Sequence, residues 1–127
     1  MTEWIWVETE TAVAAHQEQL AEWGGPDGTR DEGALESAMA RPQNLAVYGE
    51  PDAAALAASY AYGLARNHPF VDGNKRTAAV VSEGFLNLNG YILNANDAEV
   101  AVTFQALAAG EISEDELAEW FRARVLP

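Results

Sequence analysis

The residues best suited to chemistry lie in one short segment, residues 66–77. Lys75 is the only lysine in the chain; Arg76 follows it directly and Arg66 precedes it by nine residues. These three account for almost half of the seven cationic residues, whereas the chain carries twenty acidic ones. Positive charge is thus concentrated beside a histidine, a carboxylate and a glycine, which favours a site that holds anionic oxygens and moves a proton or a phosphoryl group.

The chemistry of the individual residues suggests their roles. Gly73 precedes a predicted helix, so the free amides of residues 73–75 can cradle an anion that glycine allows to come close. Lys75 and Arg76 can add charge-assisted hydrogen bonds to phosphate. Asp72 is the one carboxylate of the cluster and suits Mg²⁺, which bridges phosphate oxygens. His68 is suited to accept a proton from an attacking hydroxyl near neutral pH.

Each of these residues also has a purely structural interpretation. His68 alone is compatible with a packed or capping histidine, Asp72 with a turn residue, and Asn74 with an N-cap. Lys75 and Arg76 are compatible with a solvated helix start, although cations there oppose the helix dipole. The complete string His-Pro-Phe-Val-Asp-Gly-Asn-Lys-Arg-Thr favours the functional interpretation over a coincidence of structural ones.

The segment is expected to join two long helices of an all-α domain with about six helices and at most a marginal strand or hairpin. Predicted helices cover residues 9–23, 32–40, 53–67, 74–89 and 100–109, and a sixth ends near residue 124. The expected N-terminal signals are Asp31, Asp52, either Asn96 or Asp97, and a capping box of Ser113 and Glu116.

The remaining segments are predicted to be irregular or extended. Residues 4–7 alternate tryptophan with aliphatic residues and predict a short edge strand. Pro42 is expected to end the second helix, because proline removes an amide donor and clashes with the preceding turn. Residues 41–51 then form a loop, residues 68–73 form the loop of the motif, and residues 91–94 are extended. Phe70 is expected to anchor the motif loop in the core, and Pro69 to hold His68 in extended angles.

Length and composition limit the functions that this chain can have. At 127 residues, 1–127 is expected to be one domain that buries a core without disulfides, and the absence of cysteine excludes thiolate metal sites. The two histidines, His16 and His68, make a histidine-rich zinc site a poor interpretation. A net charge of −13 argues against direct binding to nucleic acid. No signal peptide or membrane-spanning run is predicted, so a soluble cytoplasmic location is expected.

The string at residues 68–77 resembles the signature of the Fic/Doc superfamily, and its death-on-curing (Doc) toxin branch more than the classical Fic branch. Residues 24–31, 35–43 and 85–91 are similar to other parts of Doc-like proteins, so the resemblance covers nearly the whole chain. Classical Fic proteins, which transfer AMP to a protein hydroxyl, have glycine at the position of Lys75 and a second arginine at the position of Ala79. The best-known Doc motif has alanine where this chain has Gly73.

The resemblance to the Doc branch implies a toxin of a toxin–antitoxin pair. Its implied activity is a protein kinase that transfers the γ-phosphoryl group of ATP to a threonine of elongation factor Tu and stops translation. His68 is then the base, Asp72 holds Mg²⁺, and phosphates contact Arg66, Asn74, Lys75 and Arg76. His68, Asp72 and Lys75 are the candidate catalytic residues, and Gly73 belongs to the nucleotide-binding set.

The resemblance also implies a flap and a partner. The flap that positions the target peptide is expected in residues 41–51. The partner is a Phd-like antitoxin whose carboxy-terminal segment lies on apolar surface as a helix, with Trp4, Trp6 and the two amino-terminal helices as candidate contacts. Two other functions stay open at this point: a Fic-type AMP or nucleotidyl transferase, and a non-catalytic binding module.

Overall fold

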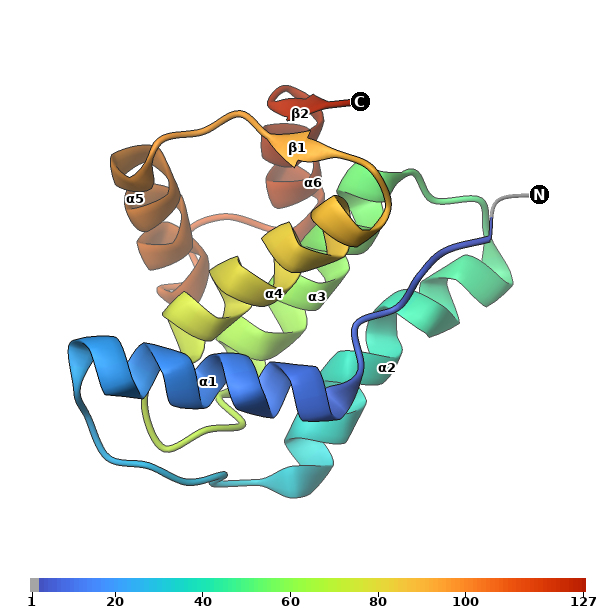
Figure 1. Ribbon diagram of the computed structural model, residues 1–127. Coiled ribbons are helices and arrows are strands. Elements are labelled where there is room, and N and C mark those ends of the chain that lie inside the picture. The colour runs from blue at the N-terminus through green and yellow to red at the C-terminus, as the bar shows by residue number, and fades with distance from the viewer. Residues whose placement is uncertain (1–2) are drawn as a thin grey trace.

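The computed structural model describes residues 3–127, which contain six helices and one antiparallel sheet of two short strands. The helices are α1 (Thr9–Trp23), α2 (Glu32–Tyr48), α3 (Ala53–Asn67), α4 (Asn74–Leu88), α5 (Asp97–Ala108) and α6 (Glu114–Arg122). The strands β1 (Ile92–Leu93) and β2 (Val125–Leu126) pair antiparallel, with Ile92 opposite Leu126. The prediction of an all-α fold is confirmed (Figure 1).

Helix α3 is the centre of the fold because its side chains are small enough for neighbours to approach on several sides. It packs against α2, α4 and α6, while α1 crosses in front of α3 and α4 in the view of Figure 1. Leu56, Tyr60 and Leu64, predicted to share one face, are all fully buried. A Cβ at Gly63 would lie 3.1 Å from the Cα of Ala38, so α2 and α3 meet almost backbone to backbone.

Helix α2 is longer than the sequence predicts. It runs through Pro42 to Tyr48, so the expected end at Pro42 and the expected loop at residues 41–51 are both wrong. An interior proline costs about 3 kcal/mol, since it loses one helical hydrogen bond and crowds the preceding turn. The ring of Pro42 is fully buried, and this packing offsets part of that cost. A flap cannot be placed in a loop at residues 41–51, because most of that range is helix.

The segment before α1 is extended but joins no sheet, so the predicted edge strand at residues 4–7 is wrong. Its hydrogen bonds go to side chains instead: the Ile5 amide donates to Asn89 Oδ1 (2.8 Å), Asn89 Nδ2 donates to the Ile5 carbonyl (3.0 Å), and the Val7 amide donates to the Tyr60 hydroxyl oxygen (3.0 Å). Trp4 and Trp6 each lie 5.9 Å from the ring of Phe85. Asn89 and Tyr60 thus take the place of the partner strand.

The predicted helix caps are confirmed, and the predicted helix ends are close to the observed ones. Asp31, Asp52 and Asn96 each accept a hydrogen bond from an amide in the first turn of the helix that they precede. Ser113 and Glu116 form the predicted capping box. Helix α4 ends one residue earlier than predicted and α5 starts three residues earlier, which is the usual uncertainty at helix ends.

Candidate active site

A cleft of about 870 Å³ opens between α1, α4 and α5, which converge at the left of Figure 1. Six of the predicted site residues line it: His68, Asp72, Gly73, Asn74, Lys75 and Arg76. Val80, Val100 and Phe104 line it too, from α4 and α5. Glu83 and Asp97 also line the cleft. The cleft therefore combines two cations at the start of α4 with apolar and acidic side chains along its walls, an arrangement that suits a ligand with a phosphate group and a flat apolar part.

The start of α4 forms the anion cradle. Gly73 is the residue before the helix and has φ 80°, a left-handed value that glycine adopts without strain. The Asn74 side chain closes the motif loop on itself: its Oδ1 accepts from the Phe70 amide and its Nδ2 donates to the Phe70 carbonyl, both at 3.0 Å. Phe70 is 1% exposed, which confirms that it anchors the loop in the core. The first-turn amides of α4 are left free of helical acceptors.

The two cations of the motif are held by uncharged groups. Lys75 Nζ donates to Gln105 Oε1 of α5 (2.6 Å), so it reaches from α4 to α5. The guanidinium of Arg76 lies 5.1 Å from the ring centre of Trp23, at the end of α1. Within residues 3–127, neither cation has a carboxylate oxygen within 4.0 Å. Both positive charges therefore remain available to an anionic ligand.

His68 has an unusual backbone. It follows the last residue of α3 with φ 48° and ψ 55°, and it is the one non-glycine residue with positive φ in the described chain. The expectation that Pro69 holds it in extended angles is therefore wrong. A left-handed residue that is not glycine costs about 1–2 kcal/mol, so surrounding contacts must hold it. Arg30 makes the nearest of these: its Nε donates to the His68 carbonyl (2.8 Å).

A second histidine, on α1, contacts the motif loop through a hydrogen bond and a ring stack. His16 of α1 is 2% exposed, and its Nε2 lies 2.7 Å from the backbone carbonyl of Asp72. A carbonyl oxygen only accepts, so Nε2 carries the proton and donates it. The imidazole also stacks on Phe70, with ring centres 3.9 Å apart and planes 6° from parallel. His16 thus fixes the backbone at Asp72 and Phe70 together.

The carboxylate of Asp72 fits a magnesium ion only with help from a ligand. No group of three or more His, Cys, Asp or Glu side chains that could hold a metal lies within residues 3–127. Mg²⁺ is often bound by one or two carboxylates together with substrate phosphates. Asp72 lines the same cleft as the anion cradle, so the donor set suits a metal that arrives with a nucleotide. Its Oδ2 would lie 2.6 Å from a Cβ at Gly25, so Gly25 leaves room for it.

One predicted site residue is not brought to the cleft. Arg66 is absent from its lining. Its guanidinium lies 5.7 Å from the ring centre of Tyr62, and its Nη1 would be 3.1 Å from a Cβ at Gly110. The assignment of Arg66 as a phosphate contact remains a prediction.

Four residues of the site were not predicted as part of it: His16, Trp23, Arg30 and Gln105. Three of them act through backbone or side-chain contacts across 30 to 56 positions of sequence. One signal was available: His16 lies four residues after Ala12 on the predicted helix, and both are buried on one face. The other three have no comparable local pattern.

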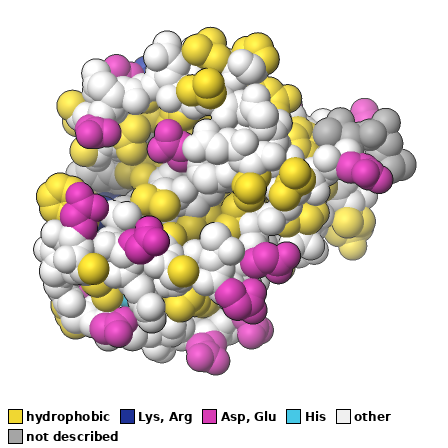
Figure 2. All heavy atoms as spheres, viewed as in Figure 1, with side chains coloured by type: hydrophobic (Ala, Val, Ile, Leu, Met, Phe, Trp, Pro, Cys, Tyr) yellow, Lys and Arg dark blue, Asp and Glu magenta, His cyan; other side chains and the backbone are white. Residues whose placement is uncertain are grey.

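The two cations at the start of α4 are an exception on an acidic protein. Aspartate and glutamate side chains are spread over the face seen in Figure 2, which shows almost no lysine or arginine. Between residues 3 and 127, no helix combines the length and the apolar character needed to cross a membrane.

Comparison with known proteins agrees with this site. The profile of the Fic/DOC family matches residues 6–86, which include α1 to α3 and most of α4. The chain is 33% identical over 117 residues to the protein kinase Doc of Escherichia phage P1, covering 91% of this chain and 92% of that protein. It is 47% identical over 77 residues to the toxin Doc of Mycolicibacterium smegmatis, covering 58% of each. The chain therefore belongs to the Fic/DOC family, and within it to the Doc branch.

Proposed function

We propose that this protein is a Doc-type toxin and a protein kinase, which transfers the γ-phosphoryl group of ATP to a threonine hydroxyl of elongation factor Tu. The observation that supports it best is the convergence of His68, Asp72, Lys75 and Arg76 on one cleft with the free amides of α4. The names of the two relatives, a protein kinase and a toxin, agree with this chemistry. Translation stops in the cytoplasm when the factor is modified.

Each residue of the site has a distinct role in the transfer. His68 takes the proton of the threonine hydroxyl, whose oxygen forms the new bond to the γ-phosphorus while the bond to the β-phosphate oxygen breaks. The products are phosphothreonine and ADP. The α4 amides, Lys75 and Arg76 bind the phosphate oxygens and stabilise the charge that moves to the leaving group. When bound, Mg²⁺ would neutralise charge between the phosphates, with Asp72 as its protein ligand.

A paired labelling assay tests this proposal. Purified protein, Mg²⁺ and elongation factor Tu receive ATP labelled at the γ position in one tube and at the α position in the other. We expect label on the factor only from the γ position, and none with His68→Ala. Label only from the α position would mean an AMP transferase. Label from neither, with folded protein free of antitoxin, would contradict the proposal and favour a binding module.

Lys75 is expected to be required for transfer of the γ-phosphoryl group. Its ammonium group crosses the cleft to Gln105, so it occupies space beside the cradle as well as carrying charge. Lys75→Met should remove γ-label transfer, whereas Arg124→Met, which changes an arginine outside the cleft lining, should not. Both variants lose one positive charge, so a difference in transfer between them shows that the location of the lost charge matters, and not only its loss.

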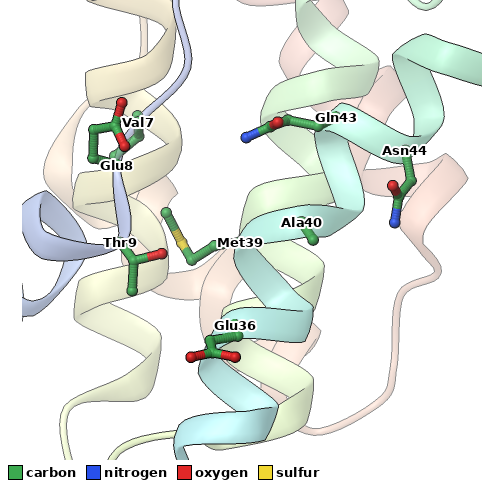
Figure 3. Close-up of a pocket in the computed structure, with 8 residues that line it drawn as sticks. All are labelled: Val7, Glu8, Thr9, Glu36, Met39, Ala40, Gln43 and Asn44. Carbon is green, nitrogen blue, oxygen red and sulfur yellow. The ribbon is translucent and has the colours of Figure 1, made fainter.

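We further propose that a Phd-like antitoxin docks on the surface of α2 and the start of α1. A groove of about 200 Å³ lies there, in which Met39 points from α2 towards Thr9 (Figure 3). Glu8 and Glu36 line it and suit a cationic side chain of the partner. The C-terminal half of α2 also leaves apolar side chains exposed, with Val47 74% exposed. Trp4 and Trp6, the other candidate contacts, are partly buried against the core.

A matched pair of variants tests this surface. Val47 on α2 and Val102 on α5 are almost equally exposed, at 74% and 72%. Val47→Asp should weaken co-purification of the antitoxin and its rescue of cell growth, because it places a charge in an apolar contact. Val102→Asp should leave both unchanged. Equal effects of the two substitutions would place the antitoxin elsewhere.

A further inference from the structure

The conformation of His68 depends on contacts from a segment that contributes nothing to the cleft lining. The loop between α1 and α2, residues 24–31, runs beside the motif loop and pairs with it through a β-bridge between Thr29 and Phe70. The amides of Arg30 and Asp31 both donate to the Pro69 carbonyl, at 2.8 and 3.1 Å. The backbone of this loop thus holds the residue that follows His68.

The side chain of Arg30 completes the contact. Its Nε donates to the His68 carbonyl (2.8 Å) and its Nη2 donates to the Asn67 carbonyl (3.0 Å). These two carbonyls lie at the C-terminus of α3, where the helix supplies no donors and its dipole attracts positive charge. One guanidinium therefore binds two successive carbonyl oxygens whose relative orientation is set by the φ and ψ of His68.

The use of Arg30 here is notable for a chain with so many acids. No carboxylate oxygen of residues 3–127 lies within 4.0 Å of its nitrogens, although Arg41, Arg122 and Arg124 each form an ion pair. Its donors go to the backbone carbonyls of Asn67 and of His68, the one non-glycine residue with positive φ in the described part of the chain. A planar fork with fixed donor directions matches this geometry, whereas an ammonium group does not.

We infer that Arg30 is a positioning residue for the catalytic base: it holds His68 in the left-handed conformation and so directs the imidazole into the cleft. This inference rests on the proposed function for its effect on transfer, but its effect on the backbone of His68 is independent of any activity. Arg30 itself does not line the cleft, so it is not expected to bind the nucleotide.

The test compares Arg30→Met and Arg30→Lys with the control Arg124→Met. Arg124 is a suitable control because it also donates to a carbonyl near the C-terminus of a helix, that of Trp120 in α6, and lies outside the cleft lining. All three variants are checked for folding by their melting curves. Arg30→Lys keeps the charge and removes the fork, so it remains informative if Arg30→Met is poorly folded.

The first readout is structural and needs no substrate. A positive φ brings the amide and α hydrogens of the same residue close together, so His68 should give a strong intraresidue NOE in the unsubstituted protein. We expect this NOE to weaken in Arg30→Met, to weaken partly in Arg30→Lys, and to persist in Arg124→Met. An unchanged NOE in both Arg30 variants would overturn the inference.

The second readout is kinetic. With Arg30→Met we expect kcat for phosphoryl transfer to fall at least about tenfold while KM for ATP changes less than about twofold, since the base is displaced and the nucleotide contacts remain. Equal kcat in Arg30→Met and Arg124→Met would also overturn the inference. If the unsubstituted protein transfers no label, the proposed function fails, and the NOE still decides whether Arg30 positions His68.

Discussion

The contact of His16 with the motif loop leads to a quantitative prediction. His16→Phe keeps an aromatic ring on Phe70 but removes the hydrogen bond to the Asp72 carbonyl, which is 2.7 Å in length. A net hydrogen bond of this kind contributes about 0.5–1.5 kcal/mol, and leaving the part-buried carbonyl without a donor adds to the loss. We expect His16→Phe to lower the free energy of unfolding by about 1–2 kcal/mol.

The alanine variant adds a second loss to the first. His16→Ala also removes the stack on Phe70, in which the ring centres are 3.9 Å apart. Aromatic pairs contribute about 0.5–1.5 kcal/mol beyond the area they bury, and the cavity adds to this. We expect His16→Ala to lower the free energy of unfolding by about 3 kcal/mol or more. The difference between the two variants then measures the contribution of packing, apart from that of the hydrogen bond.

Urea denaturation measures these differences, with Gln17→Ala as the control because its side chain is exposed on the same helix. The same variants should lower γ-label transfer, since Asp72 and Gly73 then lose the contact that fixes their backbone. The reasoning is refuted if His16→Phe is as stable and as active as the unsubstituted protein. It is also refuted if the phenylalanine and alanine variants lose equal stability.

Three further predictions concern stability. Burial raises the pKa of Tyr60 to about 12, so the folded state should lose about 2–3 kcal/mol between pH 10 and pH 12, and Tyr60→Phe should remove that alkaline loss in urea titrations. The hydrogen bond from Arg122 lowers the pKa of Asp52, so stability should fall as the pH drops below about 4. Asp52→Asn should flatten this acid dependence and cost less than about 1 kcal/mol at pH 7 in urea denaturation, because asparagine still caps α3 and the ion pair is exposed to solvent. Gly63→Val should lower the free energy of unfolding by at least about 2 kcal/mol in urea, because α2 and α3 leave no space for its side chain.

Each has an outcome that would contradict it. Tyr60→Phe with the same alkaline unfolding as the unsubstituted protein would show that another group is responsible. An Asp52→Asn protein that still loses stability steeply in acid would place the effect on other carboxylates. Gly63→Val with unchanged stability would mean that the two helices separate without cost.

Much of this protein was determined by local sequence. The helices at 9–23 and 53–67 lie where their periodicity and flanking residues predict, because a cap or a glycine acts within one turn. The capping box at Ser113 likewise needs only its own four residues. The string at 68–77 was sufficient to place the chain in its family, and six of its predicted site residues do line one cleft.

Only the tertiary structure decided the features that depend on distant contacts. Helix α2 continues past Pro42 because the ring is buried against the rest of the fold, and no local rule reports that burial. His68 adopts a left-handed conformation against the local preference of a residue before proline, because the side chain of Arg30 holds its carbonyl from 38 positions away and the paired loop holds the carbonyl of Pro69. His16 binds the carbonyl of Asp72 from 56 positions away. Such contacts depend on how α1 crosses α4, and that crossing is set by the packing of the whole core.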